Sequence, residues 1–255
     1  MEFIVFIDFK SVIFVIGGAL LIASTQKFGK ASLVLLDDLI IPLGIIGTLI
    51  GFIAMLGAES DLKGLPKAAL LALAPLFYAL AIKGFVNERP STIEAEVSWE
   101  WKTPGFLGLV FLIVYAMHSS VPEGLTVFID LPAIIYIISS ISLFAVSNLM
   151  QNQSLWTGLQ QRIVDIGLFG FMVGILLMLA DFFEPKSLGP SVAFSYLSLM
   201  YAMLILVSVR ILRPDTSWRE YNHSPISWNS LGLPFFLGLL ISVLLLLVSL
   251  SNSDQ

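Results

Sequence analysis

The sequence predicts an all-α integral membrane protein with about eight transmembrane helices, arranged as two parallel four-helix repeats. Hydrophobic residues make up 57% of its 255 residues and charged residues only 12%, about half the charged fraction of a typical soluble domain. Several apolar runs reach the roughly 18 to 20 residues that a hydrocarbon core of about 30 Å requires. Similar patterns also recur in the two halves of the chain.

Eight stretches of the chain are apolar enough to be predicted as spanning helices. Proline or aspartate marks the beginning of several of them, as with Asp37-Asp38, Pro104 and Pro190, because both residue types are favoured near a helix N-terminus. Pro75 lies inside the third stretch, where it should kink the helix and free one carbonyl. The predicted spans are 3–25, 39–57, 65–86, 104–120, 128–149, 163–182, 189–212 and 230–250.

The clearest internal repeat is a pair of glycine-striped apolar segments. GIIGTLIGFIAML at 44–56 aligns without a gap with GLFGFMVGILLML at 167–179, and the same offset of 123 carries Tyr78 onto Tyr201. Glycines spaced along one helix face let another helix approach closely inside a membrane. We therefore expect helix-packing or partner contacts at Gly44, Gly47, Gly51, Gly167, Gly170 and Gly174.

The repeat extends to the neighbouring helices. FIDFKSVIFVIGG begins at Phe6 and FIDLPAIIYIISS at Phe128, and FLGL occurs at 106–109 and again at 236–239. The unit is therefore four helices, and an even number gives two copies that cross the membrane in the same direction. The predicted domains are 1–122 and 123–255.

The distribution of basic residues predicts the orientation. Four of the thirteen Lys and Arg residues lie on the side of the two termini: Lys10, Lys63, Lys67 and Lys186. The other nine lie on the opposite side, which the positive-inside rule makes cytoplasmic. We therefore expect a multi-pass protein of a bacterial-type inner membrane with both termini outside. The first apolar stretch has no basic region before it, so no cleavable signal peptide is expected.

The residue inventory does not predict an enzyme, a cofactor, a metal site or a nucleic-acid partner. The chain has no cysteine, which excludes thiolate chemistry and cysteine-based metal sites. Phosphate loops, nucleophile triads and basic nucleic-acid stripes are not recognisable. Its two histidines, His118 and His223, are isolated from each other and from carboxylate partners, which makes metal binding a weak reading.

The carboxylates inside the predicted spans are few. Ionisable groups deep in a membrane helix are functional by default, but helix ends allow them to stay hydrated and to serve as caps. We expect five aspartates at such ends: Asp8, Asp37, Asp38, Asp130 and Asp165. Asp8 and Asp130 recur after Phe-Ile on the predicted external side, where an ion could enter.

Three helices in each half resemble the membrane core of the MotA/TolQ/ExbB proton-channel family. The resemblance rests on FIDFKSVIFVIGG (6–18), PLGIIGTLIGFIAML (42–56) and GLPKAALLALAPLFYALAI (64–82), and on their counterparts in the second half. It implies a fivefold ring of subunits around two single-span partner helices that carry the proton-bearing carboxylate. The family also has a cytoplasmic domain, which has no counterpart in the expected connections 27–37 and 150–161.

The resemblance also implies an ion pathway near Thr48, which falls where the family places a threonine beside the partner's carboxylate. A hydroxyl in hydrocarbon can hold a water or pass a proton. It can equally bond back to a carbonyl of its own helix. In the second half Phe171 stands in place of Thr48, and Ser198 could supply the hydroxyl there, whereas Pro75 occupies the matching place in the first half.

Three functions therefore remain open from the sequence. The first is a membrane subunit of a proton- or sodium-driven complex that conducts together with a single-span protein carrying a membrane Asp. The second is a non-conducting scaffold that packs against itself or against partner helices. The third is a small-solute transporter between the two halves. The bilayer is a partner in each, and a homo-oligomer is expected.

Tyr78 and Tyr201 are expected to pack or to anchor at an interface rather than to catalyse.

Overall fold

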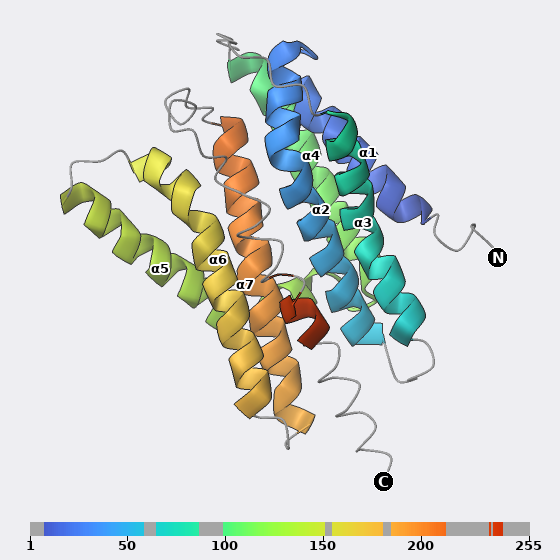
Figure 1. The fold of residues 1–255 in the computed structure, drawn as a ribbon, viewed down its shortest axis with the longest axis vertical. Helices are drawn as coiled ribbons and strands as arrows, with labels where there is room; N and C mark the ends of the chain where they lie inside the picture. The colour runs from blue at the N-terminus through green and yellow to red at the C-terminus, as the bar shows by residue number, and fades with distance from the viewer. Residues whose placement is uncertain are drawn as a thin grey trace. The chain divides into compact units, whose positions relative to one another are not determined.

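The computed structural model describes residues 8–58, 65–86, 99–150, 155–180, 185–212, 235 and 237–241. Every regular element in this part of the chain is helical, as the sequence predicts (Figure 1). The elements are α1 (Phe9–Ser24), α2 (Lys30–Ala58), α3 (Leu65–Phe85), α4 (Trp99–Ser120), the short 3-10 helix η2 (Gly124–Phe128), α5 (Leu131–Met150), α6 (Leu155–Ala180) and α7 (Pro185–Leu212).

Six of these helices, α2 to α7, are long and apolar enough to cross a membrane. The chain thus has the helices of a multi-pass membrane protein. Helix α1 is also apolar but has only 16 residues, because it begins at Phe9, after its N-cap Asp8; the first residues of the predicted span 3–25 lie outside the described part. The eighth predicted helix, 230–250, likewise falls mostly outside the described residues, although 235 and 237–241 are helical.

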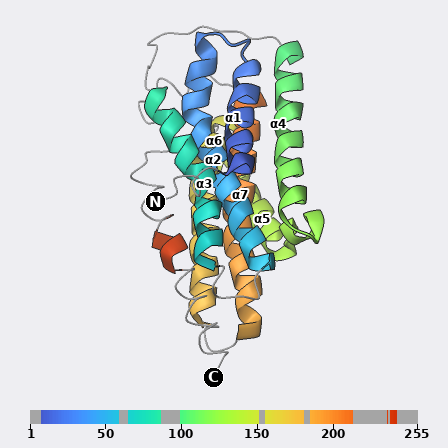
Figure 2. The same cartoon turned by 90° about the vertical axis from the view of Figure 1, so that its right-hand side faces the viewer.

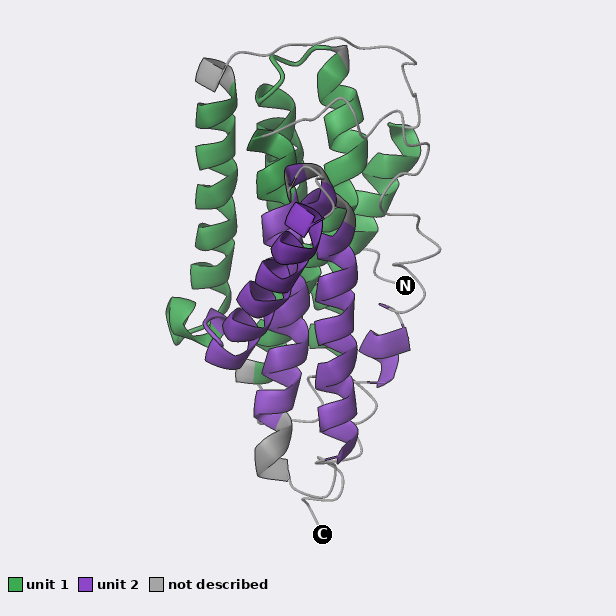
Figure 3. Cartoon of the chain, turned by 90° about the vertical axis from the view of Figure 1, so that its left-hand side faces the viewer, with its two compact units in different colours: residues 1–127, 207–214 green, residues 128–206, 215–255 purple. Residues whose placement is uncertain are grey.

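The chain divides into two compact units, coloured separately in Figure 3. The first unit consists of residues 1–127 and 207–214, and the second of residues 128–206 and 215–255. The main division after residue 127 lies five residues beyond the predicted one. The last turns of α7 belong to the first unit, which the sequence did not predict.

Four helices begin earlier than predicted. Helix α2 begins at Lys30 rather than at 39, α4 at Trp99 rather than at 104, α6 at Leu155 rather than at 163, and α7 at Pro185 rather than at 189. The predictions were wrong because Asp37, Pro104 and similar residues are typical helix starts, whereas here they lie inside helices. Within the expected connections 27–37 and 150–161, the described residues 30–37 and 155–161 are therefore helical.

In the first unit, α2 packs closely on α3 along its glycine stripe. A Cβ atom on Gly44 would lie 2.5 Å from the Cβ of Ala79, and one on Gly51 would lie 2.7 Å from the Cα of Ala72. Real Cβ contacts are not this short, so both positions require glycine. Gly44 and Gly51 therefore lie at close contacts between α2 and α3 within the chain.

Helices α1 and α4 lie side by side in antiparallel orientation (Figure 2). A Cβ on Gly105, near the beginning of α4, would meet Ser24 at the end of α1, and one on Gly108 would meet Leu21. Further along, Gly17 of α1 faces Leu112 of α4. The end of α4 therefore lies near the beginning of α1, which gathers their polar termini.

The second unit repeats the helix contacts of the first. Gly167 faces Ala202 and Gly174 faces Ser195 between α6 and α7, each 123 residues after a contact between α2 and α3. Gly47 lies against Pro75 and Phe14, and Gly170 against Ser198 and Tyr136. These further pairs recur at offsets of 123 and 122, which are also the offsets of the glycine stripe and of the FID segments in the sequence.

Candidate functional site

A cavity of about 680 Å³ lies among the first four helices of the first unit. Its deep end is lined by Gly47, Pro75 and Phe14, at the point where α1, α2 and α3 meet. Its other end, near the start of α1 and the end of α4, is lined by polar residues, namely Asp8, Lys10, Ser11, Ser119 and Ser120, and we call this end the mouth. The cavity is therefore polar at one end and apolar at the other.

The carboxylate of Asp8 is held in place at this mouth. It caps α1 by accepting hydrogen bonds from the backbone N–H groups of Lys10, at 3.3 Å, and Ser11, at 3.1 Å. The Ser11 hydroxyl donates to the same carboxylate at 2.5 Å. Asp8 is thus the N-cap that the sequence predicts, and it also lines a cavity.

Pro75 changes the backbone at the deep end. Proline has no N–H, so it cannot donate the helical hydrogen bond to the carbonyl four residues earlier. In α3 that carbonyl belongs to Leu71, which also lines the cavity. The predicted freed carbonyl therefore belongs to a residue beside the apolar end of the cavity.

Thr48 follows Gly47 on α2, next to the deep end of the cavity. Its side chain is fully buried, at 0% exposure. Its hydroxyl makes no hydrogen bond with any group in the described part of the chain. The alternative that Thr48 bonds back to its own helix is therefore wrong. A buried hydroxyl without a partner is uncommon and calls for a water, an ion or a missing partner.

The second unit is built differently at the matching positions. Phe171, in place of Thr48, stacks on Tyr196 with ring centroids 6.1 Å apart and lies 5.9 Å from the ring of Phe235. Ser198, in place of Pro75, donates its hydroxyl to the carbonyl of Phe194 at 2.6 Å. Its hydroxyl is used inside its own helix, so the second unit does not offer the same polar group.

Asp130 and Tyr201 come together at the start of α5. The Tyr201 hydroxyl donates to the carbonyl of Phe128 at 2.6 Å and accepts from the backbone N–H of Asp130 at 3.2 Å. The Asp130 side chain accepts from the N–H of Ala133 at 2.9 Å. Asp130 is thus a helix cap, and Tyr201 fixes the segment that leads into α5. Tyr78 lies beside Phe77 in an edge-to-face arrangement.

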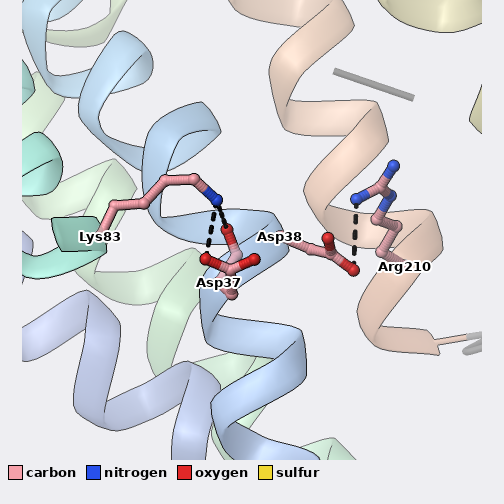
Figure 4. A network of polar contacts seen from close by, with 4 residues as sticks. All are labelled: Asp37, Asp38, Lys83 and Arg210. Carbon is pink, nitrogen blue, oxygen red and sulfur yellow. Dashed lines mark hydrogen bonds and ion pairs between the residues drawn. The ribbon is translucent and has the colours of Figure 1, made fainter. Parts of the chain in front are cut away.

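A cluster of four charged residues lies away from the cavity, near the start of α2 (Figure 4). Lys83 Nζ on α3 lies 2.8 Å from a carboxylate oxygen of Asp37 and 2.8 Å from the Asp37 backbone carbonyl oxygen. Arg210 Nη1 on α7 lies 3.8 Å from Oδ2 of Asp38. Two neighbouring carboxylates of α2 thus pair with cations from two different helices. We call these four residues the charge cluster.

The charge cluster corrects the expectation that Asp37 and Asp38 lie at a helix end. Both lie inside α2, within the span Ala31–Leu56. Asp165 also lies inside a helix, α6, where it forms an exposed pair with Arg162 at 3.8 Å. A usable signal was present in the sequence, because Lys83 and Arg210 lie on the predicted cytoplasmic side, where the predicted span 39–57 begins just after Asp37 and Asp38.

The described residues contain no group of three or more His, Asp or Glu side chains that could hold a metal ion. Comparisons of the chain with protein-family models, with curated proteins and with solved structures find no match.

Proposed function

We propose that this protein is the membrane subunit of a complex driven by a proton or sodium gradient. In this proposal it is embedded in a bacterial-type inner membrane, forms an oligomer, and conducts together with a single-span protein that carries a membrane aspartate. The observation that carries the proposal is the hydroxyl of Thr48, which is fully buried and has no hydrogen-bond partner among the described residues.

An unpartnered buried hydroxyl destabilises a protein by about 1–3 kcal/mol. Such a group is explained when another molecule satisfies it during function, and a hydrated ion or a partner carboxylate would do so here. Thr48 is also next to Gly47 at the deep end of the cavity, whose mouth carries Asp8. On the predicted orientation that end of the cavity, with the Asp8 carboxylate, faces outside.

The residues of the second half support different roles for the two halves of the chain. We infer a duplicated four-helix unit in which the first copy carries the ion site and the second serves for packing. Phe171 replaces the hydroxyl of Thr48, and the hydroxyl of Ser198 is used by Phe194. The helix contacts between Gly167 and Ala202 and between Gly174 and Ser195 are nevertheless kept.

Ion flux into proteoliposomes tests the proposal, with the chain reconstituted together with its co-purifying partner. Thr48→Val removes the hydroxyl at nearly constant volume and should abolish most of the flux, whereas Thr48→Ser should retain it. Ser198→Ala is the matched control in the second half and should leave flux unchanged. Full flux in Thr48→Val with the complex intact would reject the role of this hydroxyl.

A non-conducting scaffold is the second candidate, and the recurrence of the glycine contacts in both halves favours it. If packing is the whole function, Gly47→Leu and Gly170→Leu should both break the assembly, and Thr48→Ala should have no effect. Size-exclusion chromatography in mild detergent, with the copies of each chain counted, measures this. A homo-oligomer that contains no second chain and conducts no ions would favour the scaffold over the ion channel.

A further inference from the structure

The deep part of the cavity is apolar. Phe14, Ile50 and Leu112 line it, and the small residues Gly51 and Ala54 follow along α2 toward the mouth. A cavity with such walls does not hold water well and instead accepts an apolar guest, because water there would have few hydrogen-bond partners. The natural occupant is therefore a hydrocarbon group.

On α2 the cavity lining occupies the second half of the candidate span Ala31–Leu56. Its lining on α2 extends from Gly47 to Met55, a separation of eight residues or about 12 Å along a helix. Half of a hydrocarbon core of about 30 Å is roughly 15 Å. A cavity of this length, with its polar end where α1 begins and α4 ends, matches a single acyl chain whose headgroup stays at the mouth.

The mouth carries charges of both signs. Asp8 supplies a carboxylate, Lys10 an ammonium group on an exposed side chain, and Ser11, Ser119 and Ser120 supply hydroxyls. A headgroup with one positive and one negative group can pair with both Asp8 and Lys10. A purely anionic headgroup would pair with Lys10 but would be repelled by Asp8.

We propose that this cavity binds one acyl chain of a zwitterionic phospholipid from the leaflet at which Asp8 lies. Phosphatidylethanolamine has the required chemistry, with an ammonium group for Asp8 and a phosphate for Lys10. The chain would fill the space beside Gly47 and Pro75.

Native mass spectrometry of the full-length protein tests the binding. The protein is exchanged into detergent with equal amounts of phosphatidylethanolamine and phosphatidylglycerol of identical acyl chains, and the lipids that remain bound after collisional activation are counted. We expect one retained phosphatidylethanolamine per chain. Ala54→Phe places a ring in the cavity and should reduce retention by about tenfold or more, equivalent to about 1.4 kcal/mol.

Three controls separate binding from other effects. Ala145→Phe makes the same substitution on α5, at a residue that does not line the cavity, and this variant should retain the lipid. Ala116→Phe fills the cavity from α4 and should also lose the lipid. The melting temperature of each variant is measured, so that a folding defect of Ala54→Phe is not mistaken for a loss of lipid binding. Thr48→Val should retain the lipid even if it loses ion flux, which keeps this test separate from the test of conduction.

Two results would overturn the proposal. Equal retention by wild type and by both cavity-filling variants would show that the lipid binds elsewhere. Equal retention of phosphatidylglycerol would show that the paired charges of Asp8 and Lys10 do not select the headgroup.

Discussion

The side chains of Asp38 and Arg210 meet inside the membrane-spanning part of the chain, with Oδ2 and Nη1 3.8 Å apart. Asp38 is 14% exposed and Arg210 only 4%. Asp38 lies within the span of α2, and Arg210 lies in the last turn of α7, in the segment that belongs to the first unit. The pair therefore attaches the end of α7 to α2.

Arg210→Met should destabilise the protein strongly. The substitution leaves the buried carboxylate of Asp38 without its cation, and removing one member of a buried pair typically costs about 3–5 kcal/mol. Unfolding by SDS titration in mixed micelles measures this loss. The double variant Asp38→Leu/Arg210→Met should recover much of the stability, because it leaves no buried charge.

Lys83→Met is the matched control for that experiment. Lys83 pairs with Asp37 at the same carboxylate pair of α2, but its side chain is 37% exposed and that of Asp37 is 26% exposed. Water can solvate the carboxylate that remains, so the loss should be about 1 kcal/mol or less. A loss as large as that of Arg210→Met would show that exposure does not distinguish the two pairs.

Thr48→Val should leave the stability unchanged or raise it by about 1–3 kcal/mol. Valine has nearly the same shape as threonine, and it replaces a buried hydroxyl that makes no hydrogen bond with the described residues. The melting temperature in mild detergent measures the change. A clear loss of stability would mean that the hydroxyl has a structural partner in the protein.

Glycine-to-alanine substitutions should separate contact glycines from the others. Gly51→Ala places a Cβ 2.7 Å from the Cα of Ala72, and Gly174→Ala places one 2.5 Å from the Cα of Ser195. Both should destabilise by about 1–3 kcal/mol, because backbone atoms do not move aside easily. Gly84→Ala and Gly189→Ala meet nothing within 4 Å, so each should be neutral or stabilising by up to about 1 kcal/mol.

The comparison is made by SDS unfolding of the four variants. Equal behaviour of the contact and non-contact glycines would contradict the close approach of α2 to α3 and of α6 to α7.

Tyr201→Phe should cost about 1–2 kcal/mol, because it removes the donor to the Phe128 carbonyl and leaves the Asp130 N–H without its acceptor. Local opening at the start of α5 should also become faster in hydrogen-exchange measurements. Tyr115→Phe is the control, since Tyr115 is 60% exposed on α4. Unchanged exchange at Asp130 in Tyr201→Phe would rule out this role.

The glycine contacts were predictable from the sequence because they depend on local spacing. Gly44, Gly47 and Gly51 recur every three or four residues, which places them on one face of a helix, and a short connection makes α3 the natural neighbour of α2. The offset of 123 then predicts the same contacts for the second half. The structure brings the predicted residues together.

The charge cluster and the cavity were not predicted, for two different reasons. Asp37 and Asp38 resemble the start of a helix, and only the depth of Lys83 and Arg210 on other helices makes their position inside α2 favourable. The cavity forms where small side chains of four helices lie at the same level. The sequence of a single helix does not show which residues of the other helices lie at that level.

The replacement of Thr48 by Phe171 affects how sites are counted in any assembly of this protein. Each chain presents two glycine-striped helices of nearly the same shape, yet only one of them carries the buried hydroxyl. In a ring of such chains, every second glycine-striped helix would lack this hydroxyl. The number of proposed ion sites would then equal the number of chains. A map that shows only the helices would instead display twice as many similar glycine-striped helices as there are Thr48 hydroxyls.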